Sequence, residues 1–166
     1  MSEMTLGILG LGRIGSRIAQ VAGALGFNVI YNDLEQIPEA KRHGAEPVDI
    51  GGLLSNSDVL TVHIDGRPSN KGLLSSDKIN QLQPTVLLLN TSRGFVLDAD
   101  ALAGFLKSHE EARAVLDVHD PEPIPPDYPL LGLSNAILYP HLASRTRAAQ
   151  ANMSWVVRDV ARVLGC

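Results

Sequence analysis

Residues 10–15 (GLGRIG) have the composition of a turn that binds the phosphates of a dinucleotide. The first glycine permits a tight turn, the second lets the backbone approach a pyrophosphate, and the third lets the following helix pack close to the preceding strand. The free N–H groups at the start of that helix would face the phosphates. The candidate cofactor-binding residues here are Gly10, Gly12, Arg13, Ile14 and Gly15. The alternative is that these glycines only shape a strand–helix turn.

An acidic residue, Asp33, stands after the second predicted strand, where a dinucleotide-binding sequence has its acid roughly 20 residues beyond the glycines. Its carboxylate would accept hydrogen bonds from the adenosine ribose hydroxyls and repel a 2′-phosphate. The sequence has no arginine or lysine between Asp33 and Pro38 that would attract this phosphate. It therefore predicts NAD, and not NADP, as the cofactor.

Three further segments place polar residues directly after apolar runs. They are an arginine in LLNTSRG (88–94), several acids in LDVHDPEP (116–123) and a histidine in YPHLAS (139–144). The carboxyl ends of parallel strands lie at one edge of a sheet, where such folds bind ligands. Histidine can act as acid and base near neutral pH, and the planar arginine fork suits a carboxylate. Taken singly, Arg93, Glu122 and His141 also fit structural or solvent-exposed roles.

Apolar runs alternate with helical patterns along the chain, and these elements must position the polar residues. Strands are predicted at 5–9, 27–31, 59–63, 86–89, 114–116 and 136–138. Helices are predicted at 14–25, 38–43, 50–56, 77–82, 98–106 and 144–164. Repeated strand–helix units imply a parallel sheet with helices on both faces. We predict an α/β fold of the Rossmann type, a doubly wound sheet in three α/β/α layers, as one dinucleotide-binding domain over residues 1–166.

In this order the motifs resemble those of the D-isomer-specific 2-hydroxyacid dehydrogenases, which include phosphoglycerate, glycerate/hydroxypyruvate, formate and D-lactate dehydrogenases. The resemblance covers essentially the whole chain and rests on the glycine turn, Asn90–Gly94, Asp117–Pro123 and Pro140-His141. It implies an NAD-dependent oxidoreductase that transfers a hydride between the cofactor and a D-2-hydroxy acid or 2-keto acid. The cofactor supplies the hydride chemistry.

The resemblance also implies a role for each matching residue. Arg93 would hold the carboxylate and carbonyl of the substrate, Glu122 would pair with His141, and His141 would exchange the proton on the substrate oxygen. A carboxylate beside a histidine favours the imidazolium and fixes its orientation. Asp117 would contact the nicotinamide carboxamide. The positions that would line the cofactor are His63, Thr91 and Ser92.

The sequence departs from the family in two places. Family members carry a second, substrate-binding domain that closes over the site, and about half of a usual enzyme is missing here. Asp65-Gly66 stand where the family usually has proline and leucine, so an acid near the cofactor could weaken or alter binding. We favour a truncated chain, the cofactor domain of a full dehydrogenase, which alone would turn over poorly. The alternatives are a naturally short, non-catalytic NAD(H)-binding sensor or interaction module, and a dehydrogenase whose second domain is a separate chain.

Composition excludes other classes of function. The 166 residues carry a net charge of −4 without a basic block, which argues against nucleic acid or an anionic membrane as a partner. No apolar run approaches the roughly 20 residues of a membrane helix. The single cysteine is the last residue, so we expect a reducing, cytoplasmic setting and no metal site. The expected partner is a small 2-hydroxy or 2-keto acid, and surfaces left by the missing domain would allow a homodimer.

Overall fold

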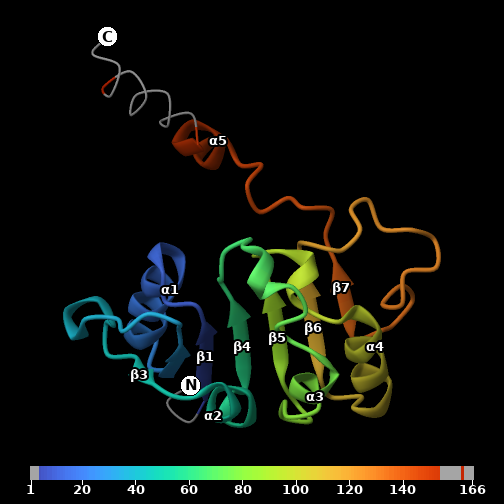
Figure 1. Ribbon diagram of the computed structural model, residues 1–166, viewed down its shortest axis with the longest axis horizontal. Helices are drawn as coiled ribbons and strands as arrows, with labels where there is room; N and C mark the ends of the chain where they lie inside the picture. The colour runs from blue at the N-terminus through green and yellow to red at the C-terminus, as the bar shows by residue number, and fades with distance from the viewer. Residues whose placement is uncertain (1–3, 154–161, 163–166) are drawn as a thin grey trace.

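A seven-stranded parallel sheet, in the order β3-β2-β1-β4-β5-β6-β7, forms the centre of the molecule in a computed structural model that describes residues 4–153 and 162 (Figure 1). The strands are β1 (Thr5–Leu9), β2 (Asn28–Asn32), β3 (Glu46–Pro47), β4 (Val59–Val62), β5 (Leu87–Asn90), β6 (Arg113–Leu116) and β7 (Ala136–Leu138). The α-helices are α1 (Arg13–Ala24), α2 (Ile50–Asn56), α3 (Ser76–Ile79), α4 (Ala99–Ser108) and α5 (Arg147–Met153).

Two hydrophobic cores, one on each face of the sheet, define the three layers. Alternate β1 residues point to opposite faces, so Ile8 packs with Ala19 and Ala22 of α1, whereas Leu9 joins Leu53 of α2 in the larger core. The larger core continues under α3 and α4. Burying each large aliphatic side chain in these cores contributes about 1.5–3 kcal/mol. The predicted α/β/α Rossmann architecture is confirmed.

Most predicted elements are present, and four differences from the prediction concern the strands and the predicted helices. The strand β3 was not predicted, because a two-residue strand shows no alternation; it pairs with Ile30 and Tyr31 of β2. The predicted helix 38–43 is a single 3-10 turn at Glu39–Lys41, and Gly44, with φ 86°, lies three residues beyond its end. The predicted helix 77–82 is the shorter α3, preceded by Ser75 without a side-chain cap hydrogen bond.

The fourth difference lies in the predicted closing helix at 144–164. It begins at Arg147, not at Ser144, and is described as helix to Met153. Except for residue 162, the rest of the predicted helix lies outside the described residues. Within the described part of the chain, no helix has both the length and the apolar character that crossing a membrane requires.

The topology brings all the candidate residues to one edge of the sheet. The chain crosses from β1 to β2 on one side and later returns to place β4 on the other side of β1, so the strand order reverses between β1 and β4. Ligands of open α/β sheets bind at such a switch point, beyond the carboxyl ends of the strands. The glycine turn, Asp33 and His63 follow β1, β2 and β4 there, and the other candidate segments follow β5, β6 and β7.

Candidate active site and cofactor site

The glycine turn has the geometry of a phosphate-binding turn. Gly10 adopts φ +93°, and a Cβ added to Gly15 would lie 2.1 Å from the Gly10 carbonyl oxygen, so both positions require glycine. A Cβ added to Gly12 would have no described heavy atom within 4 Å, which leaves room for a ligand to approach the backbone. Gly12 is also the N-cap of α1 and gives no side-chain cap hydrogen bond. The first N–H groups of this helix therefore lack a capping side chain and suit an anion.

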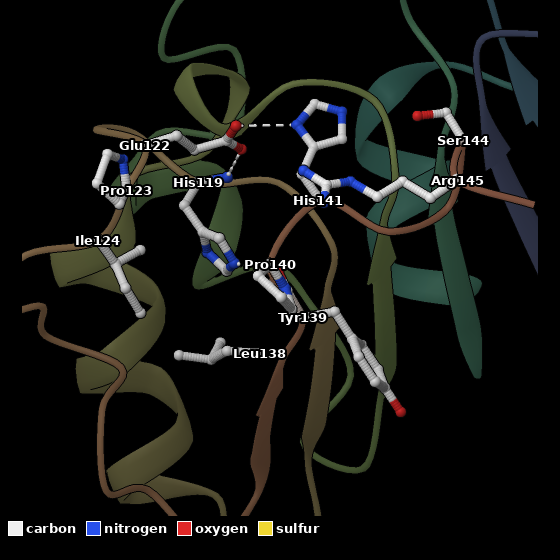
Figure 2. A pocket seen from close by; sticks show the side chains of 10 residues that line it. All are labelled: His119, Glu122, Pro123, Ile124, Leu138, Tyr139, Pro140, His141, Ser144 and Arg145. Carbon is white, nitrogen blue, oxygen red and sulfur yellow. Dashed lines mark hydrogen bonds and ion pairs between the residues drawn. The ribbon is translucent and has the colours of Figure 1, made fainter. Parts of the chain in front are cut away.

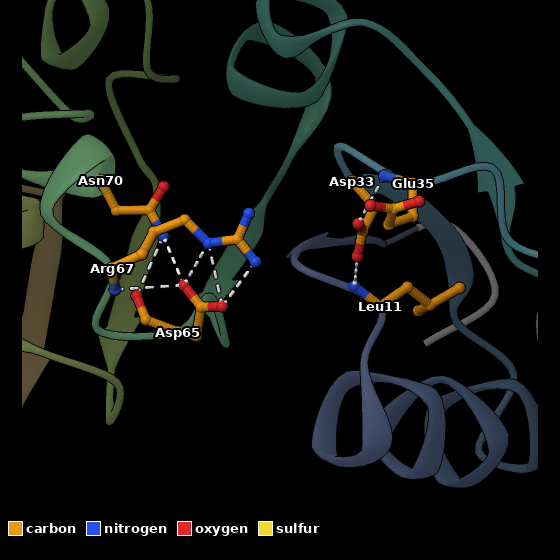
Figure 3. Close-up of polar contacts among 6 residues, drawn as sticks. All are labelled: Leu11, Asp33, Glu35, Asp65, Arg67 and Asn70. Atoms are coloured by element: carbon orange, nitrogen blue, oxygen red, sulfur yellow. Dashed lines mark hydrogen bonds and ion pairs between the residues drawn. The ribbon is translucent and has the colours of Figure 1, made fainter.

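Asp33 ties the end of β2 to the glycine turn (Figure 3). Its Oδ2 accepts a hydrogen bond of 2.7 Å from the Leu11 N–H, and its Oδ1 accepts one of 2.9 Å from the Glu35 N–H. Each carboxylate oxygen has two lone pairs, so both can accept a further hydrogen bond. The carboxylate thus orients the turn and keeps acceptor capacity for the ribose hydroxyls of a dinucleotide.

A cavity of about 500 Å³ opens at the switch point between β1 and β4. Of the residues predicted to bind the cofactor, Gly10, Gly12, Asp33 and His63 line it. Arg13 and Ile14 lie at the exposed start of α1 and are not among its lining residues. The volume lies within the range of small-molecule and cofactor sites. The open space at Gly12, the uncapped start of α1 and Asp33 together fit a dinucleotide.

His63 is a neutral member of this cavity wall. Its Nε2 lies 2.7 Å from the Thr61 Oγ1, and a Cβ on Gly10 would lie 3.0 Å from the His63 carbonyl, so β4 and the glycine turn pack closely. Burial lowers the pKa of His63 from 6.5 to about 4. The imidazole is therefore uncharged at neutral pH, and it adds no charge to the cofactor cavity.

This burial predicts an acid-dependent loss of stability. The unfolded chain takes up the His63 proton near pH 6.5 and the folded chain near pH 4, so the stabilisation is complete above pH 6.5 and is lost as the pH falls through 4. The free energy of unfolding should drop by about 2 kcal/mol between about pH 7 and pH 5 because of this group. Urea unfolding at the two pH values measures this drop. His63→Gln should reduce the drop by that amount, and an equal drop in both proteins would contradict the assignment.

The segment after β5 forms a closed turn around Asn90. The buried Asn90 Oδ1 accepts hydrogen bonds from the Ser92 N–H (3.0 Å) and Oγ (2.8 Å), and its Nδ2 donates to the Arg93 carbonyl at 3.0 Å. Ser92 is buried, whereas Thr91 and Arg93 are exposed. The Arg93 side chain donates from Nη1 to the Ser92 carbonyl and lies beside Gly66, where a Cβ would be 3.2 Å from its Nε. The turn thus presents an exposed guanidinium at the sheet edge.

Glu122 and His141, from the segments after β6 and β7, form a hydrogen-bonded pair that becomes an ion pair when His141 is protonated (Figure 2). The His141 Nδ1 lies 2.9 Å from the Glu122 Oε2, and the Glu122 Oε1 accepts a 2.7 Å hydrogen bond from the His119 N–H. Partial burial raises the pKa of Glu122, but the hydrogen bonds from His141 and His119 outweigh it and lower the pKa below its usual value. Because Nδ1 faces the carboxylate, the His141 Nε2 is left for a ligand.

Asp117 fixes the loop that carries His141. It is 6% exposed, and its two oxygens accept hydrogen bonds from the Leu142 N–H (2.7 Å) and the Ala143 N–H (2.8 Å). His141 itself has φ 55°, a left-handed conformation that non-glycine residues seldom adopt. The hydrogen bonds to Asp117 help to hold the backbone beside this conformation. This structural contribution is separate from the nicotinamide contact predicted for Asp117.

A second cavity, of about 550 Å³, lies against the Glu122–His141 pair (Figure 2). Ile124 and Leu138 form part of an apolar wall, and Arg145 also lines it. Arg93 is not among its lining residues. Among the described residues, Glu122 and His141 are hydrogen-bonded to each other, and no hydrogen bond or ion pair joins either of them to Arg93.

His119 is a site residue that sequence reasoning missed. It is 8% exposed; its backbone N–H donates to Glu122 and its Nε2 lies 2.9 Å from the Tyr139 carbonyl, so it connects the ends of β6 and β7. It also lines the second cavity. As one of five histidines, it carried no distinguishing sequence signal. In the described part of the chain, no three His, Cys, Asp or Glu side chains gather as metal ligands would.

The fold, the glycine turn and the acid after β2 define a dinucleotide-binding domain of the Rossmann type. Residues 1–143 match the sequence model of the family described as D-isomer specific 2-hydroxyacid dehydrogenase, NAD binding domain. The chain belongs to this family. The predicted resemblance and the prediction of NAD as the cofactor are confirmed.

Proteins that are similar in sequence and structure agree with this assignment. The chain is 36% identical over 156 residues to a glyoxylate reductase of Aeropyrum pernix, covering 93% of this chain and 47% of that enzyme. It is also 36% identical over 156 residues to a D-3-phosphoglycerate dehydrogenase of Archaeoglobus fulgidus, covering 93% of this chain and 30% of that enzyme. The crystal structure of D-lactate dehydrogenase with NAD+ from Lactobacillus jensenii superposes with a TM-score of 0.88 at 28% identity, covering 99% of this chain and 54% of that one. The chain thus spans about half the length, or less, of these relatives.

Proposed function

We propose that this chain is the NAD-binding domain of a dehydrogenase that interconverts a D-2-hydroxy acid and its 2-keto acid. The observation that carries the proposal is the pairing of His141 Nδ1 with Glu122 Oε2 at 2.9 Å, at the same sheet edge as the glycine turn. A catalytic acid–base needs an oriented imidazole with one free nitrogen. In this proposal residues 1–166 form one domain of a longer catalytic unit.

In this proposal His141, Glu122 and Arg93 have different roles in the reaction. Bound NAD(H) supplies the hydride that is exchanged with the substrate carbon. In the reducing direction, protonated His141 donates its Nε2 proton to the substrate oxygen, and in the oxidising direction the neutral Nε2 removes that proton. Glu122 accepts from Nδ1, which fixes the ring and stabilises the imidazolium. Arg93 provides a planar fork for the substrate carboxylate.

The cofactor is assigned to the first cavity. The proposed cofactor-binding residues are Gly10, Gly12, Arg13, Ile14, Gly15, Asp33, His63, Thr91, Ser92 and Asp117. The glycine turn and the start of α1 would hold the pyrophosphate, and Asp33 the adenosine ribose. Thr91, Ser92 and Asp117 follow β5 and β6, where the nicotinamide end would approach His141.

A substrate-binding domain completes the site in this proposal. Glu122 and His141 are 36% and 43% exposed, so this domain alone leaves the reacting groups in contact with water. Catalysis benefits from a closed site that excludes water and orients the substrate. Because the relatives include glyoxylate reductases, we propose a small 2-keto acid such as glyoxylate as the substrate. The single terminal cysteine and the net charge of −4 favour a cytoplasmic location and no nucleic-acid partner. Exposed Ile137 on the edge strand β7 and exposed Tyr139 directly after that strand offer a surface for a homodimer.

The proposal is tested by NADH oxidation with glyoxylate or hydroxypyruvate. The isolated chain should turn over far more slowly than the ~10 s⁻¹ typical of enzymes. A chimaera in which residues 1–166 replace the NAD-binding domain of the Aeropyrum pernix glyoxylate reductase should restore NADH-dependent reduction. If a folded chimaera binds NADH but shows no turnover, the catalytic proposal is wrong and a non-catalytic NAD(H)-binding module is favoured.

A further inference from the structure

The loop after β4 places a paired acid and base in the wall of the cofactor cavity (Figure 3). Arg67 Nε lies 2.8 and 3.0 Å from the two Asp65 oxygens, and Arg67 Nη2 lies 2.6 Å from Oδ2. Buried Asn70 donates from Nδ2 to the Asp65 carbonyl at 2.9 Å and to Oδ1 at 3.0 Å. The Asp65 carboxylate is thus fixed in place and holds the Arg67 fork in a bidentate contact.

Stability of the fold does not explain this pair. The side chains of Arg67 and Asp65 are 50% and 56% exposed, and exposed ion pairs contribute little to folding. The position of the pair points instead to the ligand, because Asp33 and Glu35 line the same cavity. The pKa of Arg67 is raised first by the hydrogen bond and charge of Asp65 and then, less strongly, by the charges of Glu35 and Asp33. The guanidinium therefore lies within electrostatic reach of the carboxylate assigned to the ribose.

The positive and negative side chains of the cavity wall nearly cancel in charge. The charged side chains that line it are Asp33, Glu35, Asp65, Arg67 and Lys78. Three negative and two positive groups leave one net negative charge, and the Lys78 Nζ donates to the Leu73 carbonyl at 2.8 Å. A phosphate monoester carries close to two negative charges near neutral pH. An arginine fork would bind such a group well, but in this cavity the fork already holds a carboxylate.

We propose that Asp65 is a specificity-determining residue for the cofactor. By holding the guanidinium of Arg67, it withholds this cation from the 2′-phosphate of NADP, and the cavity consequently favours NAD. Asp33 alone would not secure this preference, because a free Arg67 across the same cavity would offset its charge. The inference rests on the proposed cofactor role of the cavity. In this proposal Asp65, which stands where the family usually has proline, sets the preference for NAD and does not weaken its binding.

Asp65→Asn tests the proposal in the chain as it stands. The amide keeps an oxygen that can accept from the Arg67 N–H, but it removes the charge that holds the guanidinium. The affinity for NADPH relative to NADH should rise about tenfold, the size of effect that one charge-assisted contact has on binding. The gain should disappear in the double variant Asp65→Asn/Arg67→Ala, because it requires the freed guanidinium. Fluorescence titrations with NADH and NADPH measure both affinities.

Matched variants separate the possible outcomes. Glu110→Gln makes the same carboxyl-to-amide change at an exposed position between α4 and β6 and should leave the NADPH-to-NADH ratio unchanged. Asp65→Ala repeats the test if asparagine disturbs the loop, which circular dichroism would detect. A ratio within about twofold of the original for both folded Asp65 variants would overturn the inference while the proposed function stands. Failure of the unaltered chain to bind NADH would instead overturn the proposed function.

Discussion

His141→Ala is expected to reduce the turnover of 2-keto acids by about 10²- to 10⁴-fold, the usual contribution of a positioned acid–base group. Alanine leaves no group to give or take the proton on the substrate oxygen, and it leaves Glu122 without its 2.9 Å partner. The rate of NADH oxidation by the glyoxylate reductase chimaera measures the effect. The NADH affinity of the isolated chain should stay within about twofold, because the loss concerns the chemical step and not cofactor binding.

Glu122→Gln tests the contribution of the Glu122 charge separately from that of the His141 ring. Glutamine keeps an oxygen that can accept a hydrogen bond from His141 Nδ1 or from the His119 N–H, but it lacks the charge that stabilises the imidazolium. Its turnover should fall between those of the original chimaera and His141→Ala. Full activity of His141→Ala would show that another group transfers the proton. A large loss of NADH affinity in His141→Ala would show that His141 contributes to cofactor binding and not to the chemical step alone.

Gly94→Ala is expected to lower the free energy of unfolding by about 3 kcal/mol. Gly94 follows Arg93 and packs directly on the backbone that leads to Glu122. A Cβ at this position would lie 1.9 Å from the His119 carbonyl carbon and 2.0 Å from its oxygen. Backbone atoms cannot move aside as a flexible side chain can, so the segments after β5 and β6 would have to separate. Urea or thermal unfolding measures the loss.

Gly104→Ala is expected to have the opposite effect on the stability of the fold. Gly104 lies inside α4, and a Cβ there would meet no described heavy atom within 4 Å. Alanine should therefore stabilise the protein by about 0.5–1 kcal/mol through its better helix propensity. Equal stability of the Gly94→Ala variant and the original chain would contradict the close packing of these two segments.

The features that the sequence predicted well are encoded locally. The strand β1, the glycine turn and α1 follow one another within 20 residues, and apolar periodicity with three glycines specifies all of them. The ends of β5, β6 and β7 were predicted for the same reason, since each motif directly follows an apolar run. The contact of Glu122 with His141 came from the resemblance to the family, and the structure shows it at 2.9 Å.

The features that sequence reasoning missed depend on contacts between distant segments. Arg67 lies far from Asp33 in the sequence, so the residues next to Asp33 give no sign of this cation, although both side chains line one cavity. The hydrogen bonds of Asp117 to the loop after His141 likewise span 25 and 26 residues. His119 connects two strand ends through its own backbone and ring. No local pattern specifies such contacts, because they form only when the sheet edge assembles.

Fluorescence titration of the purified chain with NADH tests the central claim most directly. The chain should give a saturable signal, and Gly12→Val should abolish it without loss of folded structure. The added side chain would occupy the space where no described atom lies within 4 Å and would keep the pyrophosphate from the backbone. No saturable binding to the unaltered chain at millimolar NADH would contradict the account, and so would undiminished binding to a folded Gly12→Val variant.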